Sequence, residues 1–120
     1  MDLSKVVINN TAPCEIYLPD GSKSDIIIEM YGIDSKERQV AFKNSMDKLP
    51  KGSQPTAEDL ELRGLDLLAG CIASWKNIME GKKKVECNET NKLAILTQHK
   101  WLREQVDKFC ADRANFLHKA

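Results

Sequence analysis

The sequence predicts an α+β protein that is mainly α, with an N-terminal antiparallel β-hairpin packed on a bundle of about four helices. Two observations lead to this fold class. Apolar, β-branched runs flank a strong turn in the first third of the chain, whereas helical apolar spacing dominates the rest. The length of 120 residues, with 42% hydrophobic and 30% charged residues, suits one globular domain spanning residues 1–120.

The hairpin is expected within residues 1–31. Its predicted strands are Cys14–Leu18 and Ser24–Tyr31, and the second contains three consecutive isoleucines. The intervening sequence Pro19-Asp20-Gly21-Ser22 has turn chemistry, because proline presets φ and glycine tolerates a positive φ. An isolated hairpin is only marginally stable in water, so we expect it to pack on helices or to pair with another strand.

The first helix is predicted over residues 34–47. Asp34 is placed to cap its N-terminus, and Glu37 follows three residues later as in a capping box. Its apolar residues form only a modest stripe. Residues 49–55, which contain two prolines, are predicted to be a loop.

The strongest helical pattern covers residues 56–80. Thr56 is the expected N-cap, and the acidic first turn suits the helix dipole. Gly81 is expected to cap the C-terminus, followed by solvated lysines at positions 82–84. The apolar face of this helix is predicted to lie in the core, with three residues as its structural anchors: Leu68, Ile72 and Trp75.

Two further helices are predicted over residues 89–98 and 100–117. Asn88 or Thr90 begins the shorter one. Arg113 lies near the middle of the apolar stripe of the last helix, so it either snorkels at the edge of the core or pairs with a carboxylate.

The charge balance excludes several classes of protein. Lys+Arg and Asp+Glu both number 18, giving a net charge of +0. A nucleic-acid binder that neutralises phosphates needs a cationic surplus, so nucleic acid is an unfavoured partner. Zero net charge permits self-association, because copies of the chain do not repel one another strongly. We also expect no membrane-spanning segment and no secretory signal.

The lack of recognisable catalytic motifs predicts a protein that is not an enzyme. The sequence contains no G-x-S-x-G nucleophile motif, no phosphate-binding P-loop and no H-E-x-x-H metal pair, so we expect no catalytic residues, cofactor or metal site. The four cysteines show no C-x-x-C spacing and are expected to be free, small apolar residues. A dyad of Cys110 with His99 or His118 is the less favoured alternative.

Three stretches of the chain together resemble the tail assembly chaperones of long-tailed bacteriophages. The match runs from about Cys14 to Leu117, and differs in the loop 81–87, where the family commonly has an apolar pair such as Pro-Phe. The first stretch follows the hairpin and reads Tyr31-Gly32-Ile33-Asp34-Ser35-Lys36-Glu37. The second is the Trp-containing helical pattern at residues 65–78. The third, residues 87–117, is a short capped helix followed by Arg-x-Gln-Val and Asn-Phe.

The resemblance implies a non-enzymatic role in the cytoplasm of a bacterial host. Such chaperones keep the long helical tape measure protein soluble, help recruit tail tube subunits and are absent from the mature virion. The implied partners are therefore the tape measure protein and the tail tube protein. Alternatives are another phage morphogenesis component, such as a tail completion or head–tail joining protein, and a small helical nucleic-acid binder.

A holdase for a helical client needs an apolar surface of its own. The aromatic stripe near the end of the chain suggests that the last helix contributes it. The candidate partner-binding residues are Trp101, Gln105, Phe109 and Phe116.

Overall fold

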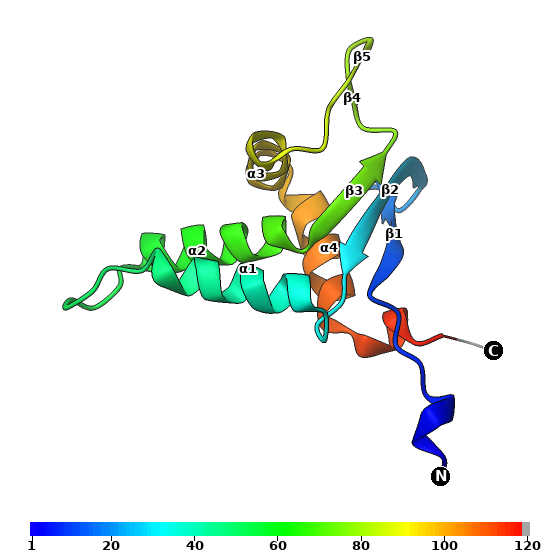
Figure 1. The fold of residues 1–120 in the computed structure, drawn as a ribbon. Helices are drawn as coiled ribbons and strands as arrows, with labels where there is room; N and C mark the ends of the chain where they lie inside the picture. Colours follow the sequence, from blue (N-terminus) through cyan, green and yellow to red (C-terminus); the bar gives the residue numbers. More distant parts are fainter. Residues whose placement is uncertain (119–120) are drawn as a thin grey trace.

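The predicted fold class is confirmed by a computed structural model, which describes residues 1–118 (Figure 1). A three-stranded antiparallel sheet packs against helices, and a small two-stranded hairpin projects from it. The elements in chain order are η1 (Leu3–Lys5), β1 (Thr11–Tyr17), β2 (Lys23–Tyr31), α1 (Lys36–Asp47), α2 (Ala57–Gly70), β3 (Ile72–Lys76), β4 (Met79–Glu80), β5 (Lys83–Lys84), α3 (Glu89–Gln98), α4 (Lys100–Ala111) and η2 (Arg113–Phe116).

The expected β-hairpin is present as β1 and β2. The strands are antiparallel, with Cys14 opposite Ile28, and the turn is closed by the N–H of Leu18 donating to the carbonyl of Ser22 at 2.8 Å. Gly21 in this turn has φ +87°, a conformation that favours glycine. Strand β3 adds to the other edge of β2, giving the order β1-β2-β3.

The helix predicted over residues 56–80 is wrong beyond Gly70. Thr56 does cap α2 in a capping box with Asp59, but the chain then leaves the helix and enters β3. The edge of β2 explains the change, because its backbone groups find partners there: the N–H of Tyr31 donates to the carbonyl of Cys71 at 2.7 Å. Tertiary pairing thus overrides a helical pattern of apolar residues.

The three expected core anchors of that pattern therefore lie on two elements. Leu68 is buried in α2, at 7% exposure, and Ile72 is buried at the start of β3, at 1%. Trp75 is only partly buried on β3, where it packs against the edge of the core. Gly81 is not a helix cap: with φ +60° it occupies the turn between β4 and β5.

Helices α1 and α2 lie side by side and form a helical arm that extends away from the sheet (Figure 1). The N-cap of α1 is Ser35, whose hydroxyl accepts from the N–H of Arg38 at 3.1 Å, and not the predicted Asp34. The helices are close where Gly70 meets Ala41, because a Cβ on Gly70 would lie 2.5 Å from the Cβ of Ala41.

The last predicted helix, 100–117, is also shorter than expected. Helix α4 ends at Ala111, and Asp112 then caps the short turn η2 by accepting from the N–H of Ala114 at 3.0 Å. A side chain that caps a new turn competes with continuation of the helix. The predicted helix 89–98 matches α3, with Asn88 as its N-cap.

Helix α4 and η2 pack against β1 and β2. Alternate residues of both strands face this core, as period-two burial requires. The apolar run at residues 5–8 forms no further strand and contributes a single bridge, between Ile8 and Leu117. The most deeply buried side chains include Ile16, Ile28, Met30, Ile72, Leu96, Val106 and Phe116.

Candidate protein-binding groove

An open groove of about 750 Å³ lies where the β1–β2 turn, the β3–β4 connection and the α3–α4 junction meet. We call it the Trp101 groove. Most of its charged lining lies on β2 and β4, where Lys23, Asp25 and Glu80 contribute. Its apolar lining is drawn from five separate parts of the chain: Leu18, Ile26, Ile78, Met79, Ile95, Trp101 and Leu102.

Trp101 gives the groove its largest apolar side chain. It is the second residue of α4 and is partly buried, with its ring edge-on to that of His99 at a centroid distance of 6.0 Å. His99 breaks the continuity between α3 and α4, since its φ of −121° and ψ of 79° are not helical. An aromatic ring held in this way presents a rigid apolar surface at little entropic cost on binding.

Asn77 shapes another part of the groove. Its backbone has φ +69°, in the left-handed region that asparagine tolerates better than most residues, and its side-chain amide donates to the carbonyl of Asp25 at 2.8 Å. The turn places Ile78 in the core, at 6% exposure, and leaves Met79 47% exposed. Met79 therefore offers a flexible apolar side chain to an incoming partner.

Of the four candidate partner-binding residues, only Trp101 lines this groove. Gln105 instead clamps the end of β1: its amide donates to the carbonyl of Tyr17 and accepts from the N–H of Tyr17, both at 2.8 Å. Phe109 packs edge-on against Phe116 with their ring centroids 5.5 Å apart. Phe116 is 1% exposed, so its role is in the core and it offers no surface to a partner.

Sequence reasoning missed six apolar groove residues: Leu18, Ile26, Ile78, Met79, Ile95 and Leu102. The sequence predicts Leu18 in a strand, and Ile78 and Met79 in the long helix that ends early. One usable signal is present in the sequence, because Leu18 directly precedes the Pro19 turn. The structure leaves Leu18 40% exposed.

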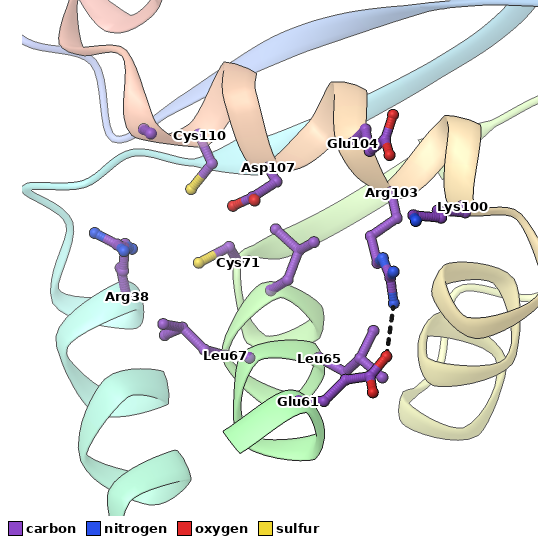
Figure 2. Close-up of a pocket in the computed structure, with 13 residues that line it drawn as sticks. Arg38, Glu61, Leu65, Leu67, Cys71, Lys100, Arg103, Glu104, Asp107 and Cys110 are labelled. Carbon is purple, nitrogen blue, oxygen red and sulfur yellow. Dashed lines mark ion pairs between the residues drawn. The ribbon is translucent and has the colours of Figure 1, made fainter. Parts of the chain in front are cut away.

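A second hollow of about 370 Å³ lies between α1, α2 and α4 (Figure 2). We call it the thiol pocket, since Cys71 and Cys110 line it together with Arg38 and Asp107. Cys110 donates from its Sγ to the carbonyl of Tyr31 at 3.3 Å. At the other end of the pocket, the dashed line in Figure 2 marks a 3.9 Å ion pair between Arg103 and Glu61.

The pKa values of the two thiols are shifted in opposite directions. The neighbouring Cys110 thiol, together with the charge of Arg38, lowers the pKa of the Cys71 thiol against the opposing effect of burial. The neighbouring Cys71 thiol and burial raise the pKa of Cys110. Within residues 1–118, Nε of Arg38 has no hydrogen-bond partner. Within residues 1–118, Cys110 bonds the Tyr31 carbonyl, and no hydrogen bond joins it to His99 or His118 as the alternative dyad would require.

The helical arm exposes apolar side chains of its own. Phe42 on α1 is 47% exposed. The guanidinium carbon of Arg63 lies over its ring, 4.9 Å from the ring centroid. The Arg63 Nε also contacts the sulfur of Met46 at 3.0 Å. Leu60 of α2 is 51% exposed. The arm is thus a second surface with accessible apolar area.

Other site types and relatives give no further guide to function. In the part of the chain that the structure describes, no helix is long and apolar enough to cross a membrane. Residues 1–118 also contain no cluster of three or more His, Cys, Asp or Glu side chains arranged to hold a metal. No protein-family model, curated protein or solved structure matches this chain.

Proposed function

We propose that this chain is a phage tail assembly chaperone. In this role it binds the tape measure protein, keeps it soluble and helps recruit tail tube subunits in the bacterial cytoplasm, without enzymatic activity. The observation that carries the proposal is the Trp101 groove, which is open, mostly apolar and about 750 Å³ in volume. The exposed side chain of Met79 forms part of its lining. The resemblance of residues 14–117 to that family supplies the identity of the client.

The groove suits one apolar stripe of a helix. An amphipathic helix docks by inserting residues at i, i+3, i+4 and i+7 into an apolar groove. Tryptophan is the residue most enriched among side chains that dominate binding energy, and Met79 can adapt to clients of different shape. Many copies of the chaperone can then bind successive turns of a long client without sequence-specific contacts.

The exposed side chains of the helical arm support the same role. A holdase must bind repeatedly and then release its client when the tail tube polymerises. Several weak sites achieve this better than one tight site, because dissociation from each remains fast while avidity keeps the client covered. Phe42 and Leu60 give the arm apolar area that is separate from the Trp101 groove.

Co-expression with the tape measure protein tests the proposal. Trp101→Ser and Met79→Ser, singly and combined, should shift the tape measure protein from the soluble to the insoluble fraction. Leu117→Ser is the matched control, because Leu117 is 44% exposed and lies outside the groove. Phe116 is unsuitable for this test, since a polar residue there would unfold the core.

Two outcomes would contradict the proposal. In one, the folded double variant keeps the tape measure protein as soluble as the wild type does. In the other, mass spectrometry finds the chain at stoichiometric levels in purified virions, which would favour a tail completion or head–tail joining protein.

A further inference from the structure

We infer that the β4–β5 hairpin makes the Trp101 groove selective for amphipathic helices whose apolar stripe is flanked by acidic residues. This inference rests on the proposed binding of a helical client in that groove. We call residues 79–84 the lysine hairpin, because Lys82, Lys83 and Lys84 follow Met79 and Glu80 around its turn. Figure 1 shows the hairpin projecting beyond the end of the sheet.

The pairing of the hairpin places a lysine beside the groove. Met79 is opposite Lys84, and Glu80 is opposite Lys83. Directly opposed residues of antiparallel strands point to the same face, so Lys84 shares a face with Met79. Because Met79 lines the Trp101 groove, the ammonium of Lys84 is within reach of a helix bound there.

The base of the hairpin is tied to the body of the protein. The indole N–H of Trp75 donates to the carbonyl of Val85 at 2.8 Å, and the N–H of Val85 donates to the carbonyl of Ile78 at 3.0 Å. Asn91 of α3 then donates from its side-chain amide to the carbonyl of Glu86 at 2.8 Å. These contacts hold the lysines in one place relative to the groove.

The charges around the groove are unbalanced, although the whole chain is neutral. The groove lining itself carries one positive charge, on Lys23, and two negative charges, on Asp25 and Glu80, and the three hairpin lysines beside it bring the sum of these six charges to +2. Glu80 already faces Lys83 across the strand pair. Within residues 1–118, none of the three hairpin lysines forms an ion pair. The surplus cations are therefore available to a partner.

An acidic helix fits this combination better than nucleic acid or a lipid surface does. Nucleic-acid binding relies on a surplus of cations across the protein, and this chain has as many acidic as basic residues, 18 of each. A lipid surface would be met by a broad amphipathic face, whereas the apolar residues here line a groove. An apolar groove with the lysine hairpin beside it matches an apolar stripe that carries carboxylates next to it.

Synthetic helical peptides test the inference directly. Three peptides of about 20 residues carry the same leucine stripe at helical spacing, with flanking positions filled by Glu, Gln or Lys. Fluorescence anisotropy of labelled peptide measures the affinity of the full chain for each. We expect the Glu peptide to bind about tenfold more tightly than the Lys peptide at low salt, and the ratio to shrink at high salt because exposed charges are screened.

Charge reversal identifies the lysines responsible. Lys82→Glu/Lys84→Glu should invert the preference, so that the Lys peptide binds more tightly than the Glu peptide. Lys43→Glu/Lys51→Glu is the matched control with the same change in net charge, because both lysines are exposed and lie outside the groove. The control should retain the wild-type order of affinities.

The outcomes separate this inference from the proposed function. Equal affinities for the three peptides, or an order of affinities unchanged by the hairpin reversal, would overturn the selectivity and leave the groove intact as a binding site. Unchanged binding by Trp101→Ala would overturn the groove itself. Tighter binding to a single-stranded RNA or to anionic vesicles than to the Glu peptide, lost on hairpin reversal, would assign the lysines to nucleic acid or to a membrane.

Discussion

Replacing Gln105 by alanine should destabilise the fold, which distinguishes a structural clamp from a partner-binding residue. Its amide closes the end of β1 by bonding both the N–H and the carbonyl of Tyr17 at 2.8 Å. Its Nε2 donates also to the carbonyl of Trp101 at 3.0 Å. β1 is an outer strand of the sheet. The Gln105 side chain therefore supplies the hydrogen-bond partners that the backbone of Tyr17 would otherwise find in a neighbouring strand.

The magnitude follows from these three hydrogen bonds. Each contributes about 0.5–1.5 kcal/mol net to the free energy of unfolding when its partners are protected from water. Tyr17 is 39% exposed, so water replaces part of what is lost. Alanine in a helix also has a propensity advantage of a few tenths of a kcal/mol over glutamine. We therefore expect Gln105→Ala to lower the free energy of unfolding by about 1–2 kcal/mol.

Urea denaturation measures the loss, and hydrogen exchange locates it. The amide of Tyr17 should exchange faster in Gln105→Ala by more than the global destabilisation explains, because its acceptor has been removed. Glu104→Ala is the matched control: this neighbour is exposed and should change stability by less than about 0.5 kcal/mol. A Gln105→Ala variant with wild-type stability and unchanged Tyr17 exchange would refute the clamp.

Three further variants test the packing and the thiol pocket. Phe116→Ala should cost about 3–5 kcal/mol in chemical denaturation, since the ring is fully buried; a loss below 1 kcal/mol would contradict that placement. Gly70→Ala should destabilise the helical arm by about 1–3 kcal/mol despite its better helix propensity, and Ala41→Gly in the same chain should recover part of the loss. Arg38→Gln removes a charge that favours the thiolate, so the pKa of Cys71 should rise and its alkylation, followed by mass spectrometry, should shift to higher pH. An unchanged labelling midpoint would contradict the contact.

The hairpin and the caps were predictable because their signals are local. Residues 19–22 carry turn chemistry that needs no knowledge of the rest of the chain, and the N-caps Thr56 and Asn88 act within a few residues of themselves. Asp34 shows the limit of such reasoning. It has the right residue type for a cap, but it pairs with Arg113 at 2.9 Å, and the hydrogen bond from that guanidinium lowers the pKa of the Asp34 carboxyl.

Strand β3 was not predictable from its own residues. Apolar side chains at positions 71, 72, 75, 78 and 79 fit a helix, and Gly70 is only a weak local sign of the break because an isolated glycine is tolerated inside a helix. What decides the structure is the free edge of β2, more than 40 residues away in the sequence. The candidate site follows the same pattern: Trp101 is a candidate from its type and position, whereas Ile78 and Met79 join its groove only once β3 is in place.

The early end of α2 is what creates both parts of the proposed binding site. Had the helix continued to residue 80, Ile78 and Met79 would lie on one helical face with Trp75, and the lysines would follow as a solvated cap. Because β3 pairs with β2 instead, the turn at Asn77 places Met79 in the lining of the same groove as Trp101. The same turn starts the lysine hairpin, and Trp75 holds its base. The apolar groove and the lysine hairpin beside it therefore share one structural cause, and a change that releases β3 from β2 should remove client binding and acidic selectivity together.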